Sequence, residues 1–171
     1  MRQMVAFIVF AFFLYFPYVW SALRGESPER YGLFWKLTPS SARDVLFVTL
    51  GTLVPLTGIV FLFFSRSLPP WTMERFLPGL LSGLAAAVSE ETFFRGWLQT
   101  LLSRRMSAWW SILLANILFG LSHIFQGPFA MLAFFPGLLM GLLRSRHGSV
   151  LPAILYHWFG NIWSIWFYPH F

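Results

Sequence analysis

The sequence predicts an all-α membrane protein: a polytopic helix bundle of about six transmembrane helices with a polar pocket within the membrane. Three observations predict this fold. The chain has 171 residues, of which 57% are apolar and 11% are charged, whereas an average soluble domain carries roughly 25% charged residues. Apolar runs of helical length recur along the chain, and some of them contain ionisable side chains. A soluble protein of this size could not bury so much apolar surface.

The composition also excludes other classes of protein. An aromatic content of 20% does not fit a disordered chain, and a disulfide scaffold requires cysteine, which is absent. The net charge of +6 would favour nucleic acid in a soluble protein. Here the basic residues stand mostly between apolar runs, where they set topology and contact lipid headgroups. We therefore expect the lipid bilayer as a partner and no nucleic acid.

Six apolar runs are candidates for membrane spans, because a hydrocarbon core of about 30 Å requires about 20 helical residues. They cover residues 4–23, 45–64, 76–102, 108–125, 129–143 and 150–167. Proline interrupts the first, second and fifth runs at Pro17, Pro55 and Pro136, and the fifth is short for a span. No clean A-x-A cleavage site follows the first run, so we interpret it as a retained helix rather than a signal peptide. One domain, residues 1–171, accounts for the whole chain.

The connections between the runs predict an orientation. The only long polar connection covers residues 25–43. Six spans would place both termini on one side, together with three basic residues, and eight basic residues on the other side. The eight are Arg24, Arg30, Lys36, Arg43, Arg104, Arg105, Arg144 and Arg146. Because Lys and Arg remain on the cytoplasmic side, both termini are expected to face outward.

Small residues at regular spacing predict close contacts between helices. Gly79, Gly83 and Ala87 recur every four residues, and Gly137 and Gly141 repeat the same spacing. In lipid, this pattern lets helix backbones approach each other. We interpret both sets as ordinary packing positions.

Polar side chains within three runs indicate a functional site, because ionisable groups inside a membrane are costly and usually functional. They form three patterns, Glu90-Glu91-x-x-x-Arg95, Phe119-x-x-x-His123 and His157-x-x-x-Asn161. Helical residues four apart share one face, so Glu91 and Arg95 are expected to form an ion pair that braces the site. Glu90 points about 100° away from Glu91 and can address a different space.

The remaining polar residues favour amide hydrolysis. Helical rise places Glu90, His123, His157 and Asn161 in the middle half of the bilayer, where they are expected to converge on a water-accessible cavity. Neither a cysteine nor a Gly-x-Ser-x-Gly motif is present, so water is the expected nucleophile. A carboxylate among apolar helices suits a general base, and N–H donors on one helical face suit the oxyanion of a tetrahedral intermediate.

In order and spacing, the three patterns resemble the motifs of the CPBP family, which comprises the type II CAAX prenyl endopeptidases and the bacteriocin-processing or immunity-related Abi proteins. The resemblance covers about residues 80–167, within a motif-bearing core of about 76–167. It implies a glutamate-dependent intramembrane endopeptidase, a peptide hydrolase. The catalytic residues it implies are Glu90, His123, His157 and Asn161, and the supporting ones are Glu91, Arg95 and Phe119.

The roles implied by the resemblance follow the motifs. Glu90 would activate the water with the help of His123, and His157 and Asn161 would form the oxyanion site. The substrate would be a membrane-anchored protein or peptide, and no cofactor would be required. Only about two helices precede the first motif, which resembles the small bacterial and archaeal members. That branch implies an integral protein of the prokaryotic cell (inner) membrane that processes C-terminal tails, with prenylation of the substrate left open.

Three other functions remain open at this point. Two histidines and a glutamate would satisfy a catalytic zinc site, although His-Glu-x-x-His is absent and the histidines belong to different helices. The pocket would also suit a non-catalytic, immunity-like membrane binding protein. A proton-coupled transporter is disfavoured because no inverted repeat is visible. Asn116 is interpreted as an interhelical hydrogen-bonding residue and His147 as non-catalytic.

Overall fold

The computed structural model describes residues 2–124 and 133–168, and within these ranges its regular structure is entirely helical. The helices are α1 (Arg2–Leu23), α2 (Pro39–Phe64), α3 (Met73–Glu91), α4 (Gln99–Ser103), α5 (Ala108–Ser122), α6 (Phe134–His147) and α7 (Leu151–Phe167). Two 3-10 turns lie in connections, η1 (Pro28–Tyr31) and η2 (Ser65–Ser67), and a π-helical segment, η3 (Thr92–Leu98), joins α3 to α4 without a break. The described chain therefore forms six helical rods, and the predicted all-α bundle is confirmed.

The rods correspond to the six predicted runs and differ from them at the ends. α2 begins at Pro39 rather than at residue 45, because its polar first turn is capped. Thr38 Oγ1 accepts a hydrogen bond from the Ser41 N–H at 3.2 Å, and Ser41 Oγ accepts one from the Thr38 N–H at 2.8 Å. α5 ends at Ser122 and α6 begins at Phe134. The predicted ends of these two runs, at 125 and 129, lie outside the described residues.

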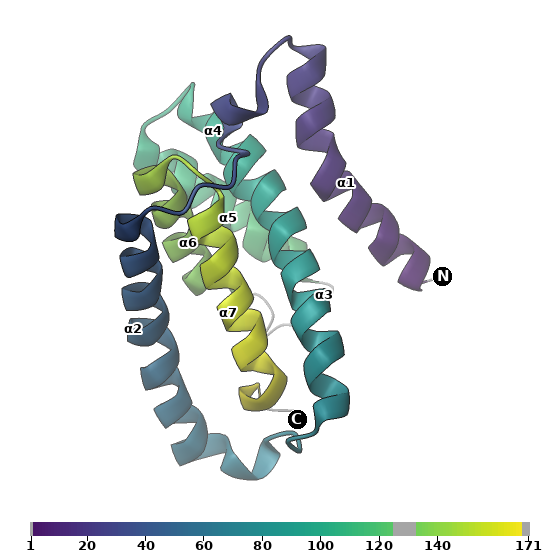
Figure 1. Cartoon of the computed structure of the whole chain (residues 1–171), viewed down its shortest axis with the longest axis vertical. Coiled ribbons are helices and arrows are strands. Elements are labelled where there is room, and N and C mark those ends of the chain that lie inside the picture. The colour runs from purple at the N-terminus through teal and green to yellow at the C-terminus, as the bar shows by residue number, and fades with distance from the viewer. Residues whose placement is uncertain (1, 125–132, 169–171) are drawn as a thin grey trace.

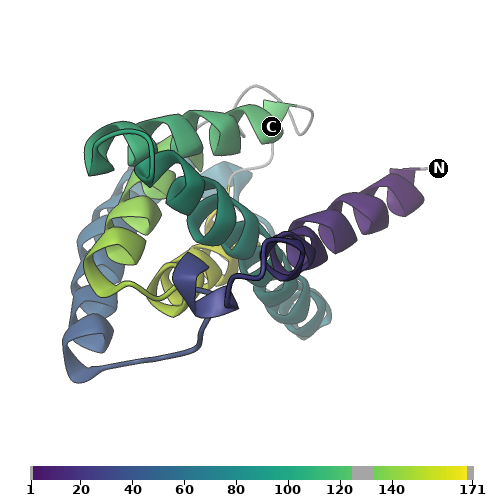
Figure 2. The ribbon, with the colours of Figure 1, turned by 90° about the horizontal axis from the view of Figure 1, so that it is seen from above.

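The bundle is built around α7 (Figure 1). This helix lies between α2 and α3 and contacts both of them, and α5 and α6 pack against each other behind it. α1 contacts α3 and η3 and leans away from the bundle toward its N-terminus, as the view from above shows (Figure 2). α3 and α7 therefore form the centre of the fold, and both carry predicted site residues.

Two of the described helical segments are long and apolar enough to cross a membrane, Met4–Leu23 and Pro39–Ser67, and Ala108–Ser122 is a shorter apolar helix. The two long segments bury little of their surface in the bundle and expose large apolar side chains, such as Phe7 on α1 and Leu62 on α2. Water would penalise such surfaces, whereas lipid accepts them. The exposed faces fit the predicted membrane bundle.

The predicted glycine contacts occur between helices. A Cβ atom at Gly79 would lie 2.8 Å from Ile165 Cδ1, and one at Gly83 would lie 2.9 Å from Asn161 Cβ. These positions therefore let α3 approach α7 closely, as small residues do in membranes. The interpretation of this stripe as a packing surface is confirmed.

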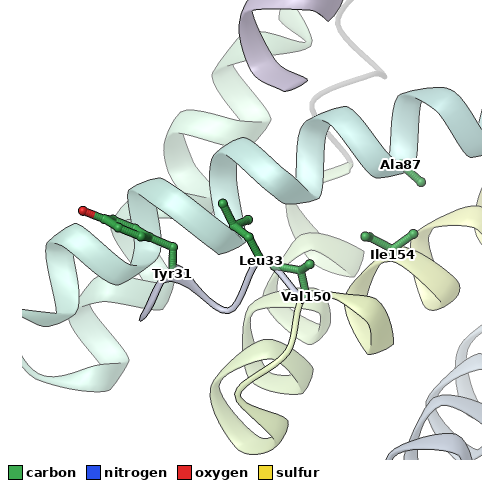
Figure 3. Close-up of a cluster of buried hydrophobic side chains, with 5 residues drawn as sticks. All are labelled: Tyr31, Leu33, Ala87, Val150 and Ile154. Carbon is green, nitrogen blue, oxygen red and sulfur yellow. The ribbon is translucent and has the colours of Figure 1, made fainter. Parts of the chain in front are cut away.

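The long polar connection packs back into the bundle. Tyr31 and Leu33 are buried and form a cluster with Ala87 of α3 and Val150 and Ile154 at the start of α7 (Figure 3). The backbone also joins this contact, since the Val150 N–H donates to the Gly32 carbonyl at 2.9 Å. This connection thus fixes the ends of α3 and α7 relative to each other.

The basic connections gather at one end of the bundle (Figure 1). Arg104, after α4, pairs with Glu26 at 3.0 Å, and Arg146 and His147, at the end of α6, pair with Asp44 of α2 at 3.0 and 3.1 Å. Acidic residues thus tie neighbouring connections together at the end that carries most of the basic side chains.

Candidate active site

The first motif lies where α3 changes into the π-helix η3. Glu90 and Glu91 are the last two residues of α3, and Arg95 lies in the middle of η3. A single π-helical segment inside an α-helix is rare and occurs frequently at functional sites. Arg95 points from this segment into the bundle, where it is 1% exposed.

Glu91 and Arg95 form the predicted ion pair in the centre of the protein. Arg95 Nη1 donates to Glu91 Oε1 at 3.2 Å, and both side chains are almost completely buried. His157 of α7 reaches the same carboxylate oxygen, with its Nδ1 at 2.9 Å. Burial of a charge pair is costly unless its hydrogen-bonding groups are also satisfied. The contact with His157 therefore links η3, α3 and α7 through one oxygen atom.

The other side of Arg95 is held by α5 and α6. Its Nη2 donates to Asn116 Oδ1 at 3.3 Å and to the Gly137 carbonyl at 3.0 Å. Asn116 in turn donates through Nδ2 to the Phe134 carbonyl at 2.8 Å. The interpretation of Asn116 as an interhelical hydrogen-bonding residue is confirmed, and its contact with Arg95 also connects it to the predicted site.

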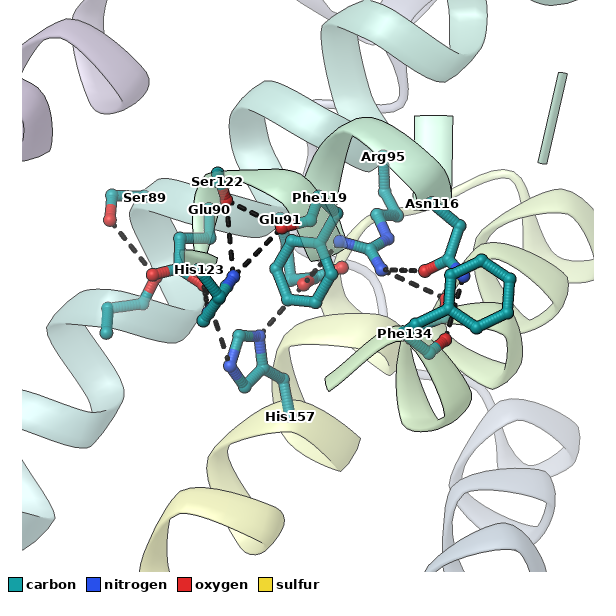
Figure 4. A network of polar contacts seen from close by, with 12 residues as sticks. Ser89, Glu90, Glu91, Arg95, Asn116, Phe119, Ser122, His123, Phe134 and His157 are labelled. Carbon is teal, nitrogen blue, oxygen red and sulfur yellow. Dashed lines mark hydrogen bonds and ion pairs between the residues drawn. The ribbon is translucent and has the colours of Figure 1, made fainter. Parts of the chain in front are cut away.

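Glu90 lies on the open side of this network, beside both histidines (Figure 4). Its Oε2 is 3.8 Å from His123 Nε2 and 3.8 Å from His157 Nε2. These separations exceed hydrogen-bond length, and Glu90 Oε2 is a buried oxygen without a hydrogen-bond partner among the described residues. The Glu90 side chain as a whole is 19% exposed, in contrast to Glu91, which is 0% exposed. The two adjacent glutamates thus occupy different environments.

The ring of Phe119 orients the groups around it. It contacts both imidazoles edge-on, with centroid distances of 4.7 Å to His123 and 5.9 Å to His157. The Arg95 guanidinium carbon lies 4.1 Å from its centroid, a cation–π contact. The Phe119 carbonyl also contacts His123 Nδ1 at 2.9 Å. This one residue therefore touches members of all three motifs.

Asn161 lies one turn beyond His157 but has a different contact. Its Nδ2 donates to the Gly83 carbonyl at 2.9 Å, on α3 and about two turns before Glu90. The structure thus brings Glu90, His123 and His157 together around one oxygen atom, and it places Asn161 along the α3–α7 interface next to them.

No group of three or more His, Cys, Asp or Glu side chains among the described residues is arranged to hold a metal ion. His147, interpreted as non-catalytic, pairs with Asp44 at the basic end and has no contact with the predicted site. The pair of His147 and Asp44 is thus a second contact between an imidazole and a carboxylate, separate from the predicted site.

Sequence reasoning missed two features of this site. The π-helix has no visible signal in the sequence, and the Gly137 carbonyl could not be identified as an Arg95 acceptor because backbone groups carry no sequence signature. The glycine itself was noted, and its backbone is approachable only because it lacks a side chain: a Cβ there would lie 2.0 Å from Asn116 Oδ1.

Comparison with known proteins identifies a family. Residues 70–163, more than half of the chain, match the family described as type II CAAX prenyl endopeptidase, Rce1-like. The matched segment contains all three motifs. No curated protein and no solved structure matches the chain. The chain therefore belongs to the Rce1-like type II CAAX prenyl endopeptidases of the CPBP family, which are membrane-embedded proteases.

Proposed function

We propose that this chain is a glutamate-dependent intramembrane endopeptidase in which Glu90 activates a water molecule. One observation carries the proposal: Glu90 Oε2 is buried, lacks a hydrogen-bond partner in the described part of the chain, and faces Nε2 of both His123 and His157 at 3.8 Å. These separations exceed direct hydrogen-bond length, so a water in contact with all three atoms is the group that would link them. A water between these three atoms would be held by two imidazoles and activated by a carboxylate.

The hydrogen bond at Nδ1 of His123 determines whether its Nε2 donates or accepts. A backbone carbonyl only accepts hydrogen bonds, so the contact between His123 Nδ1 and the Phe119 carbonyl requires a proton on Nδ1. The neutral ring then has a lone pair on Nε2, directed at the Glu90 side. His123 would therefore orient the water by accepting one of its protons in a hydrogen bond, while Glu90 removes the other.

The proposed reaction needs no group beyond these side chains and water. As the water oxygen forms its bond to the peptide carbon, Glu90 takes the water proton and an oxyanion develops. The tetrahedral intermediate then collapses, the carbon–nitrogen bond breaks, and Glu90 returns the proton to the leaving nitrogen. The products are a new carboxyl terminus and a new amino terminus.

His157 and Asn161 would stabilise the oxyanion from one face of α7. The contact of His157 Nδ1 with Glu91 Oε1 at 2.9 Å orients the ring with Nε2 toward Glu90, and this Nε2 would donate to the oxyanion when the ring carries both protons. An asparagine amide has two N–H donors, and the bond to Gly83 occupies one of them. The second remains for the substrate, and Glu91 and Arg95 would hold His157 in place.

The substrate in this proposal is a membrane-anchored protein or peptide that is cleaved near a C-terminal tail. The site supports this because its residues come from helices whose outer faces are apolar, so a substrate segment in lipid can lie against them. The Glu90 and His123 side chains are also partly exposed. The resemblance to the small bacterial and archaeal members supports a prokaryotic cell membrane. The basic end of the bundle supports an orientation with both termini outside.

Comparison of protein termini tests the proposal. Membrane proteins from cells that express the wild type, Glu90→Gln or Glu29→Gln at matched levels are analysed for new amino and carboxyl termini. Glu29 is an exposed glutamate in η1, so Glu29→Gln controls for the loss of one carboxylate. New termini are expected with the wild type and Glu29→Gln only. If cells with Glu90→Gln show the same new termini as cells with the wild type, at equal folding and abundance, glutamate-dependent hydrolysis is contradicted.

We assign no metal to this reaction, because a carboxylate that activates water needs none. Cleavage of a substrate identified by its new termini is therefore expected to persist after treatment with 1,10-phenanthroline. Loss of cleavage that zinc restores would instead favour the zinc-dependent mechanism.

A further inference from the structure

A second candidate site lies at the basic end of the bundle, in a cleft made by residues other than those around Glu90. The cleft has a volume of about 310 Å³ and lies between the end of α1 and the end of α4. It is lined by Trp20, Arg24, Leu101, Arg104 and Arg105. Pockets for small molecules begin at about 300 Å³, so the cleft has room for a polar headgroup but not for a whole lipid.

The arginines around the cleft differ in how their charges are compensated. Arg104 forms two hydrogen bonds with Glu26, at 3.1 and 3.0 Å. The hydrogen bond from Arg104, followed by one from Tyr31, lowers the pKa of Glu26, which therefore remains anionic and compensates Arg104. Arg24 and Arg105 are exposed and have no acidic partner among the described residues. The cleft therefore has two uncompensated positive charges.

Apolar surface continues from this cleft into the membrane region. Trp20 and Leu101 form its apolar lining, and the Arg24 guanidinium lies 5.5 Å from the centre of the Trp20 ring. Val19 and Leu23, on the adjacent stripe of α1, are 53% and 81% exposed. A ligand with an anionic head and an apolar tail would satisfy both surfaces, whereas free phosphate would use only the arginines.

We propose that this cleft binds the phosphate headgroup of an anionic phospholipid, with the acyl chains along the exposed stripe of α1. Charge complementarity supports an anion, and the position of the cleft where two helices end supports a lipid headgroup. Basic pockets between membrane helices are a known type of site for anionic headgroups. Arg24 and Arg105 would contact the phosphate, and Arg104, held by Glu26, would form the wall.

Fluorescence quenching by brominated lipids tests this site directly. The purified full-length protein in detergent is titrated with phosphatidylglycerol brominated in its acyl chains, and in parallel with brominated phosphatidylcholine. Bromine quenches tryptophan on contact, so saturable quenching by phosphatidylglycerol is expected, with little by phosphatidylcholine. A Trp20→Phe variant identifies the component of the signal from the cleft. Equal quenching by both lipids, or a saturable signal unchanged by Trp20→Phe, would overturn the proposal.

Matched arginine variants separate a site from general charge attraction. One positive charge near a membrane surface contributes about 1 kcal/mol, so Arg24→Gln and Arg105→Gln are each expected to weaken phosphatidylglycerol binding about fivefold. Arg66→Gln removes the same charge from η2, at the opposite end of the bundle (Figure 1), and is expected to change nothing. Equal weakening by Arg66→Gln would overturn the proposal. So would reversal of the quenching by inorganic phosphate at constant ionic strength.

Discussion

At the scale of single residues, Arg95 is a buried charged side chain that needs several hydrogen-bond partners. Its charge is buried, and it satisfies Glu91, Asn116 and the Gly137 carbonyl at once. Removing one partner of a buried pair leaves an uncompensated charge, which is costlier than the pair itself is stabilising. Arg95, in η3, therefore holds together groups from three other helical segments, α3, α5 and α6.

We predict that Arg95→Met lowers the free energy of unfolding by about 3–5 kcal/mol, because Glu91 loses its charged partner in the interior. The measurement is unfolding of the purified protein in mixed micelles. Arg30→Gln is the control: Arg30 is exposed and lies 3.9 Å from Glu26, and exposed pairs contribute about 0–1 kcal/mol. Equal free energies of unfolding for the two variants would show that the Glu91–Arg95 pair contributes no more to stability than an exposed pair.

A second prediction at this scale compares His123, which faces Glu90, with His147, which pairs with Asp44. If His123 orients the water, His123→Gln is expected to reduce the cleavage rate about 10²-fold or more, the lower range for loss of acid–base assistance. His147→Gln, which removes an imidazole at the basic end, is expected to retain the rate. Rates are measured on a substrate identified from its new termini, in protein of equal abundance. Full activity of His123→Gln would remove His123 from the mechanism.

At the scale of elements, the site depends on how closely α6 approaches η3 and α5. A Cβ at Gly137 would lie 2.0 Å from Asn116 Oδ1 and 2.8 Å from Arg95 Nη2. Gly160 is also a helical glycine, one turn from the histidine on α7, but a Cβ there would meet nothing within 4 Å. These two glycines thus offer the same substitution with opposite consequences.

We predict that Gly137→Ala lowers both stability and activity, because the added methyl group separates Arg95 from its acceptors. Gly160→Ala is expected to keep the activity and to stabilise the helix by up to about 1 kcal/mol, the propensity difference between the two residues. Thermal unfolding and the cleavage assay, applied to both variants, provide the measurement. An unaffected Gly137→Ala protein would mean that α6 can shift without disturbing the site.

The elements also show what the sequence could and could not predict. Apolar length located the six rods, and the polar first turn of α2 was missed although Thr38, Pro39 and Ser41 form a recognisable cap. The three motifs predicted which helices meet, and the separation of four residues predicted the Glu91–Arg95 pair. The bond from Glu91 to His157 was not foreseen, because it depends on how α7 rotates against α3, which close packing decides.

At the scale of the whole molecule, the chain divides into two functional parts. The matched family segment, residues 70–163, contains the three motifs, whereas α1 and α2 precede it. α2 packs on α7, and α1 packs through Phe13 and Phe16 on Phe93 and Trp97 of η3. These two helices, which bury little of their surface, thus support the elements that carry the site from outside.

The distribution of positive charge across the molecule leads to a prediction about its orientation. Eight basic residues lie in or beside the connections at one end, so that end is expected to be cytoplasmic. The chain contains no cysteine, and a single introduced thiol therefore reports its own position. Ser65→Cys, at the opposite end, is expected to react with a membrane-impermeant maleimide in intact cells, and Ser107→Cys only after permeabilisation, since both positions are exposed. The reverse pattern would invert the protein and place the basic cleft in the outer leaflet.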